Sequence, residues 1–149
     1  MQPTLERAQL AEGTTSRASL TLESTIASVN VVEEAALEYA RAAGFSPDIA
    51  SHLSMVAGEA TANAVIHGNK QDPEKRITAT FEIIGTALKI TIADQGAGLD
   101  PDSIPDPLAP ENLLRSSGRG VFLMRAFMDE VNFRNLNPGT EITLVKRRT

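Results

Sequence analysis

Two runs of alternating apolar and polar residues, separated by a two-residue turn, constrain the fold of this chain more than any other feature. The runs are Arg76 to Ile84 and Ala87 to Ala93, with Gly85-Thr86 between them. One side of the first run is apolar and carries Ile77, Ala79, Phe81 and Ile83. Such alternation is typical of a strand with one buried face, and the short connection predicts a β-hairpin. The chain must therefore supply a layer that covers this apolar face.

The rest of the chain predicts one more strand, three helices and a second hairpin. Strands are expected at residues 17–23, 130–134 and 141–147, and helices from a cap at Ser24 or Thr25 to residue 43, at 47–68 and at 119–128. Adjacent hairpins imply a mostly antiparallel sheet, covered on one face by the helices. The predicted fold class is α/β (α+β), a two-layer sandwich. Residues 1–16 are polar and lack periodicity, which predicts a mobile N-terminal tail, and residues 17–149 form one domain.

The helix expected at 47–68 carries two stripes of side chains. An apolar stripe at helical spacing consists of Leu53, Ala57, Ala60 and Ala64. Glu59, Asn63 and His67 recur at steps of four and line a polar stripe about 100° round the helix from the first. Because a solvated helix face usually shows this spacing too, the polar stripe does not indicate a site by itself.

Three glycine motifs follow this helix along the chain. Asp94 comes directly after a predicted strand and is followed by Gly96 and Gly98, Gly118-Arg119-Gly120 opens the last helix, and Gly139-Thr140 precedes the last strand. Each motif alone can be a tight turn or a flexible helix start. Glycines also let the backbone approach a ligand closely, and free amides at a helix N-terminus favour phosphate. Together with the polar stripe, the motifs predict a nucleotide site.

The residue types in this set match the needs of such a site. Asp94 can accept a hydrogen bond from the exocyclic amine of a base, and the Asn63 side-chain oxygen is a suitable hard ligand for Mg²⁺. Glu59 lies one helical turn earlier and can accept a proton from an attacking hydroxyl group. Thr140 can contribute a hydroxyl group that contacts the nucleotide through an ordered water molecule.

The segment from residue 99 to 117 is long, irregular and contains four prolines. A loop of this length in a compact domain is usually functional or disordered, and we expect a mobile lid over the triphosphate. Arg115 and Arg119 are alternative candidates for the positive charge that such a lid would bring to the phosphates.

Composition excludes several other classes of protein. The absence of cysteine excludes disulfides and thiolate metal sites, and the net charge of −5 argues against a nucleic-acid-binding protein. No apolar run approaches the ~20 residues of a membrane span, and no signal peptide is recognisable, so a cytoplasmic protein is expected. Neither a P-loop nor a Rossmann fingerprint is present.

The four motifs resemble the sequence boxes of the GHKL ATPases, the superfamily of gyrase B, Hsp90, sensor histidine kinases and MutL. Glu59-x-x-x-Asn63 resembles the N box, and Asp94-x-Gly96-x-Gly98 resembles the G1 box. Gly118-x-Gly120 is similar to the G2 box and Gly139-Thr140 to the last glycine box. The resemblance extends from about residue 19 to residue 146.

Three further segments narrow the resemblance within that superfamily. Residues 63–68, residues 106–115 and the run from Gly120 to Val131 are similar to the anti-sigma-factor serine/threonine-protein kinases, the group of the sporulation and stress-response switch kinases. Histidine-kinase activity is disfavoured, because the chain has no separate pair of dimerisation helices. The gyrase and MutL classes are disfavoured, because a transducer domain does not fit into this length.

The resemblance implies a Bergerat ATP-binding fold in which Asp94 holds adenine, Asn63 holds Mg²⁺ and Glu59 acts as the base. Members of the family transfer the γ-phosphate of ATP to a serine of a small anti-anti-sigma (STAS-domain) protein, and many also hold a sigma factor inactive. The resemblance also implies a homodimer, across which an exposed first strand at residues 19–22 could pair. It gives His67 no secure role.

Three hypotheses about function remain at this point. The first is that the chain is an ATP-dependent protein serine kinase. The second is that it is a nucleotide-dependent module that sequesters a sigma factor and has weak or no kinase activity. The third is that it is an α/β domain whose glycines serve only in turns. Glu59 favours the kinase, because a sequestering module does not need a base there. Four motifs in register disfavour the third hypothesis.

Overall fold

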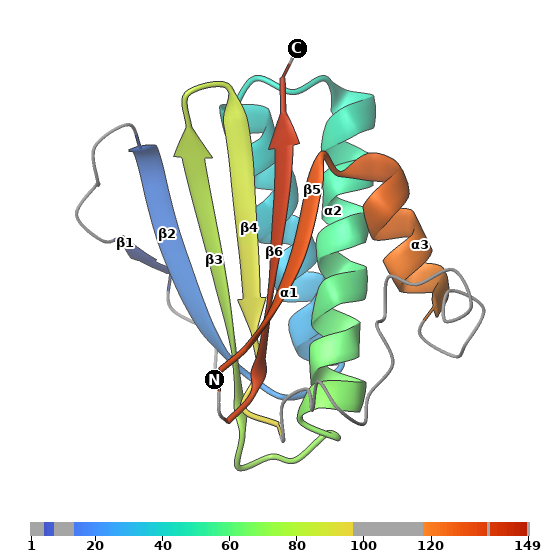
Figure 1. The fold of residues 1–149 in the computed structure, drawn as a ribbon. Helices are drawn as coiled ribbons and strands as arrows, with labels where there is room; N and C mark the ends of the chain where they lie inside the picture. The colour runs from blue at the N-terminus through green and yellow to red at the C-terminus, as the bar shows by residue number, and fades with distance from the viewer. Residues whose placement is uncertain (1–4, 8–13, 97–117, 137, 149) are drawn as a thin grey trace.

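The computed structural model describes residues 5–7, 14–96, 118–136 and 138–148, and within them it confirms the predicted two-layer α+β sandwich (Figure 1). One layer is an antiparallel sheet with the strand order β1-β2-β3-β4-β6-β5. The strands are β1 (Leu5–Arg7), β2 (Thr14–Glu23), β3 (Arg76–Ile84), β4 (Ala87–Ala93), β5 (Glu130–Asn135) and β6 (Thr140–Arg147). The other layer contains α1 (Ala27–Ala42), α2 (Pro47–Asn63) with a π-helical turn η1 (Ala64–Gly68), and α3 (Gly118–Phe127).

The predicted alternation places one face of every central strand in the core. Leu20 pairs with Ala79, Ala79 with Ile92, and Ile92 with Ile142, so that these residues form a continuous apolar row across four strands. Phe133 of β5 extends the row and packs against the core. Because side chains alternate between the two faces of a strand, this register directs the whole row toward the helices.

Small residues let the two long helices pack closely against each other. Helices α1 and α2 run in opposite directions over one face of the sheet, with α3 beside α2 (Figure 1). Ala36, Ala40 and Ala57 in these helices are fully buried. A Cβ at Gly58 would lie 2.7 Å from the Glu33 Cγ atom of α1, so the Glu33 side chain would have to move to admit even a methyl group. In the described part of the chain, no helix combines the length and the apolar character that crossing a membrane requires.

The start of α2 agrees with the prediction, and the start of α1 does not. Ser46 caps α2, because its hydroxyl accepts a hydrogen bond from the Ile49 amide at 3.3 Å, and Pro47 is the first helical residue. In α1 the cap residue is Ile26, without any side-chain capping bond, so a cap at Ser24 or Thr25 is wrong.

Near the start of α1 the Thr25 and Ser28 hydroxyl groups bond elsewhere, and the buried Ser24 hydroxyl has no hydrogen-bond partner among the described residues. Thr25 Oγ1 lies 3.4 Å from Ser28 Oγ, and the Ser28 hydroxyl donates to the Glu23 carbonyl at 2.7 Å. These contacts join the helix start to the end of β2.

The structure also corrects the predicted N-terminal tail at residues 1–16. Part of that stretch forms β1, and β2 begins at Thr14. Leu5 pairs with Leu20, and Arg7 pairs with Ala18. Backbone hydrogen bonds along a neighbouring strand can order a segment that has no apolar periodicity, which is why the pattern did not reveal it. The part of β2 expected to be free for pairing across a dimer is therefore partly covered by β1.

Candidate functional site

The polar stripe lies on the last two turns of α2. Glu59 and Asn63 are both half-buried, and Asn63 is the last residue of the α-helix. Ala60 and Ala64 beside them are buried at 2% and 7% exposure and fix this face of the helix against the core. The structure thus places the two candidate residues one turn apart with small neighbours, as the sequence predicted.

The predicted helix does not continue unchanged to Gly68. After Asn63 the chain widens into η1, in which the Asn69 amide donates to the Ala64 carbonyl at 2.8 Å, five residues back. His67 lies in this turn and is exposed, so it leaves the regular spacing of the polar stripe. Lys70 and Gln71 follow with φ angles of 53° and 57°, which turn the chain sharply toward β3.

Asp94 lies at the end of β4 and is 7% exposed. Its Oδ1 atom accepts hydrogen bonds from the Gly96 amide at 2.9 Å and from the Thr140 amide at 3.1 Å, and its own amide donates to the Thr140 carbonyl at 2.9 Å. Burial raises the pKa of the Asp94 carboxyl group above its ordinary value, against the opposing effects of those two amides and of the Lys75 charge. A buried carboxylate held by two amides at a strand end has a fixed direction, and it is chemically able to accept a hydrogen bond.

Three glycines allow the segments around Asp94 to approach each other. A Cβ at Gly68 would collide with the carboxylate of Asp94, and a Cβ at Gly96 would collide with the Gly68 carbonyl oxygen. Gly139 has a φ angle of +103°, and a Cβ there would collide with the Asp94 carbonyl oxygen. The end of α2, the end of β4 and the β5–β6 turn therefore meet at one place, and backbone is packed against backbone there.

Sequence reasoning missed Asn69 and Gln95, which join these segments. Asn69 is buried at 1% exposure, and its side chain accepts a hydrogen bond from the Gln95 amide at 2.8 Å and donates one to the Arg76 carbonyl at 3.0 Å. The Gln95 side chain accepts a hydrogen bond from the Arg76 amide at 2.7 Å. The position of Asn69 directly after Gly68 is the one sequence signal that could have drawn attention to it.

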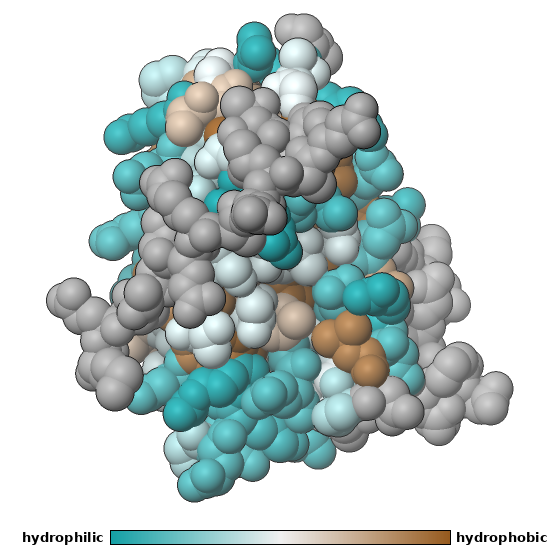
Figure 2. Space-filling model, turned by 90° about the vertical axis from the view of Figure 1, so that its left-hand side faces the viewer, coloured by the Kyte–Doolittle hydropathy of each residue, from teal (hydrophilic) through white to brown (hydrophobic). Residues whose placement is uncertain are grey.

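The end of the molecule that carries this turn is hydrophilic. Figure 2 views the side of β2 and shows hydrophilic residues over the lower end, where the turn between η1 and β3 lies in Figure 1. Lys70, Gln71, Glu74 and Arg76 are exposed there.

Helix α3 begins at Gly118, one residue before the predicted start, and is held nearer its other end by two packing contacts. The Met124 side chain is fully buried, and the Phe127 ring stacks on the His52 ring of α2 with centroids 4.5 Å apart. The side chain of Arg119, together with Gly98, Arg115 and the predicted lid at 99–117, lies outside the described residues.

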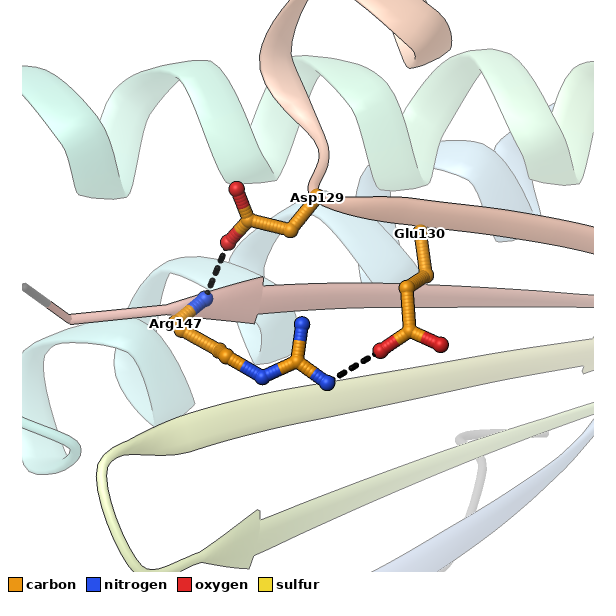
Figure 3. Close-up of polar contacts among 3 residues, drawn as sticks. All are labelled: Asp129, Glu130 and Arg147. Carbon is orange, nitrogen blue, oxygen red and sulfur yellow. Dashed lines mark hydrogen bonds and ion pairs between the residues drawn. The ribbon is translucent and has the colours of Figure 1, made fainter.

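Polar contacts fasten the chain directly after α3 to the last strand (Figure 3). The Asp129 carboxylate accepts a hydrogen bond from the Arg147 amide at 2.6 Å, and the Asp129 amide donates to the Val145 carbonyl at 2.8 Å. The Arg147 guanidinium forms an ion pair with Glu130. These contacts fix the end of α3 relative to β6.

Comparisons with known proteins match most of the chain. Residues 22–146 match the model of the histidine kinase-like ATPase domain family. The anti-sigma F factor of Anoxybacillus flavithermus is 36% identical over 107 residues, which are 68% of this chain and 72% of that protein. The serine-protein kinase RsbW of Staphylococcus epidermidis is 35% identical over 111 residues, which are 70% of this chain and 69% of that protein.

Solved structures show the same fold. The crystal structure of the RsbU and RsbW domains of a Mycobacterium tuberculosis protein superposes with a TM-score of 0.65 at 20% identity and covers 89% of this chain and 32% of that one. A histidine kinase domain from Erythrobacter litoralis superposes with a TM-score of 0.56 at 16% identity and covers 93% of this chain and 70% of that one.

Proposed function

We propose that this chain, which belongs to the anti-sigma-factor serine-protein kinases of the histidine kinase-like ATPase family, is an ATP-dependent kinase of a partner-switching module. Its substrate is a serine of an anti-anti-sigma (STAS-domain) protein, and its second partner is a sigma factor. The observation that carries the proposal is the junction at which Gly68, Gly96 and Thr140 surround the buried Asp94 carboxylate, beside the helix of Glu59 and Asn63.

Asp94 is the base-reading residue in this proposal. Its carboxylate is held by two backbone amides on Oδ1, so its direction is fixed before a ligand arrives. A fixed acceptor favours a base with an exocyclic amine at that position, and therefore adenine over guanine. Because Gly68 carries no side chain, the carboxylate keeps this position, into which a Cβ at Gly68 would intrude.

Asn63 and Glu59 divide the remaining chemistry between them. Asn63 supplies a carboxamide oxygen for Mg²⁺, which in nucleotide sites keeps water and phosphate oxygens as its other ligands. The described residues contain no group of three or more His, Asp or Glu side chains that could hold a metal ion. The donor set therefore fits an ion that reaches the site with the triphosphate, held by a single protein side chain.

Glu59 is the proposed general base. The serine oxygen of the partner protein attacks the γ-phosphorus, its proton passes to the Glu59 carboxylate, and ADP leaves with the electrons of the broken phosphorus–oxygen bond. Phosphoryl transfer depends mostly on positioning and charge, and Glu59, the proposed base, lies one turn of α2 before Asn63, the proposed magnesium ligand. Arg115 and Arg119 are the proposed sources of positive charge toward the phosphates, and the Thr140 hydroxyl is a further proposed contact.

The second candidate function is a sequestering module that binds a sigma factor in a nucleotide-dependent manner with little transfer. It would keep Asp94 and Asn63 and would have no use for Glu59.

The proposed assembly is a homodimer.

A pair of substitutions on α2 tests the proposal. The protein is incubated with labelled ATP, Mg²⁺ and a STAS-domain protein from the same host. Glu59→Ala should slow phosphoryl transfer roughly 10²–10⁴-fold with little change in ATP affinity. Asn63→Ala should lose Mg²⁺-dependent ATP binding as well as transfer. Matching thermal melts of the two variants exclude a common folding defect.

The outcomes separate the two candidate functions. Transfer by the Glu59→Ala variant at the wild-type rate shows that this carboxylate is not the base. ATP binding by the wild-type protein without transfer to any partner serine favours the sequestering module.

A further inference from the structure

We infer that Asn69 is a positioning residue, which holds the Asp94 segment in the geometry that binds nucleotide; this inference rests on the proposed function. Asn69 is 1% exposed although the polar residues that follow it in the turn are exposed or half-buried. Its two polar atoms contact two segments that are distant in the sequence, the chain directly after β4 and the start of β3. Burial of a carboxamide is costly unless both of its ends are paired, so the position requires a specific partner on each side.

The contacts of Asn69 close a ring of three hydrogen bonds. Asn69 Oδ1 accepts from the Gln95 amide at 2.8 Å, and Asn69 Nδ2 donates to the Arg76 carbonyl at 3.0 Å. Gln95 Oε1 completes the ring by accepting from the Arg76 amide at 2.7 Å. Each bond has one backbone and one side-chain partner, so the ring connects three stretches of main chain.

The carboxamide of asparagine has the right chemistry at this ring position. One end of the side chain must accept and the other must donate, and a carboxamide does both. Aspartate has the same shape, but it would place an oxygen against the Arg76 carbonyl oxygen. Alanine would leave both the Gln95 amide and the Arg76 carbonyl without this partner.

The ring acts on Asp94 through the peptide that follows it. The Gln95 amide belongs to the peptide bond that leaves Asp94, so the bond from Asn69 fixes the plane of that peptide. The next amide, that of Gly96, is one of the two donors to Asp94 Oδ1. A shift of the Gln95 peptide therefore moves the Gly96 amide away from the carboxylate.

The same ring ties Asp94 to the helix of the proposed magnesium ligand. Asn69 directly follows Gly68, whose carbonyl oxygen packs against Gly96, and its amide bonds back to Ala64. The turn η1 is thus the only covalent segment between Asn63 and the ring. The base-binding end and the metal-binding end of the proposed site are held together over this short distance.

The test compares Asn69→Asp and Asn69→Ala with a matched control, Ser54→Ala. The Ser54 hydroxyl makes the same kind of bond, to the Glu33 carbonyl at 2.8 Å, between α2 and α1. ATP affinity is measured by calorimetry with Mg²⁺, kinase activity is measured at varied ATP concentration, and hydrogen exchange is followed at the Gln95 and Gly96 amides in nucleotide-free protein.

Both Asn69 variants should weaken ATP binding about 10- to 100-fold, since a misplacement on the order of 1 Å has effects of this size. KM for ATP should rise while kcat at saturating ATP changes little, because the hydrogen-bonded ring around Asn69 affects nucleotide binding and does not involve Glu59, the proposed general base. A merely structural role would instead lower the active fraction, and with it kcat. Exchange at the Gln95 and Gly96 amides should become faster, and Ser54→Ala should show none of these changes.

A second variant keeps the inference testable if the Asn69 variants do not fold. Gln95→Ala removes an exposed side chain that closes the ring, and we expect a smaller rise of KM in the same direction. If the wild-type protein binds ATP and these variants bind it equally well, the inference is wrong and the proposed function stands. A wild-type protein that binds no ATP overturns the proposed function itself.

Discussion

Substitution of Gly68 by alanine sets two effects of opposite sign against each other. Gly68 ends η1 without a left-handed backbone, so alanine is compatible with its main-chain conformation. On that ground alone alanine should stabilise the protein by about 0.4–1 kcal/mol, because it reduces the freedom of the unfolded chain. In the folded protein, however, the new Cβ would collide with the Oδ2 and Cγ atoms of Asp94.

The collision decides the sign. The Asp94 side chain is short, so it can make room only by turning away from the amides of Gly96 and Thr140. A hydrogen bond to a charged group contributes about 1.5–3 kcal/mol, and two such bonds are lost. We therefore expect Gly68→Ala to lower the free energy of unfolding by about 2–5 kcal/mol and to abolish measurable ATP binding.

Urea unfolding and calorimetric ATP titration measure the two quantities, with Gly85→Ala as the matched control. Gly85 lies in the β3–β4 turn at a φ angle of +59°, and no heavy atom lies within 4 Å of the position of its Cβ. Its substitution should cost only the left-handed strain, about 1–2 kcal/mol, with unchanged ATP affinity. A Gly68→Ala protein that is more stable than the wild type and binds ATP equally well would refute the packing of Gly68 on Asp94.

Three further predictions concern the contacts of Asp94 and of Asp129. Asp94→Asn keeps an oxygen that can accept hydrogen bonds from both amides, so the free energy of unfolding should change by less than about 1 kcal/mol. Loss of the negative charge should weaken ATP binding about 10- to 100-fold, measured by calorimetry. Burial raises the pKa of the Asp94 carboxyl group, so the folded protein holds this proton more tightly than the unfolded chain does. Thermal melts at varied pH should therefore show the wild type losing stability relative to Asp94→Asn as the pH rises from the ordinary aspartate pKa through the raised one. ATP affinity should fall as the pH is lowered through the raised pKa of Asp94. Asp129→Ala removes the acceptor of the Arg147 amide and should lower the free energy of unfolding by about 1 kcal/mol in urea titrations, without a change in ATP affinity.

Helices and strands whose apolar residues recur at a regular spacing, or that begin at a local cap, could be predicted well. The alternating run that contains Phe81 forms β3, and its hairpin partner forms β4 at the predicted boundaries. The Ser46-Pro47 pair starts α2 where expected, because a cap and a proline act locally. The motif that places Asp94 directly after a strand was also readable, since it depends on a local change from alternation to glycine.

Features that depend on distant partners could not be predicted. Asn69 and Gln95 are 26 residues apart, and nothing in either neighbourhood distinguishes them from ordinary turn residues. The strand β1 depends on backbone pairing with residues 18–20 of β2. Its own sequence has no alternating pattern that would predict a strand. The widening at η1 directly precedes the bonds of Asn69 to Arg76 and Gln95, while the residue pattern continues at the α-helical period past Asn63.

The bond between Asp94 and the Thr140 amide has a consequence for the order of events during synthesis. The two residues are 46 positions apart, and Thr140 begins the last strand. Contacts of large sequence separation form late, because the loop between them must close first. A growing chain therefore contains Glu59 and Asn63 before the Asp94 carboxylate has both of its donors. Nucleotide capture then becomes a marker of completed folding, since it begins only when β6 has joined the sheet.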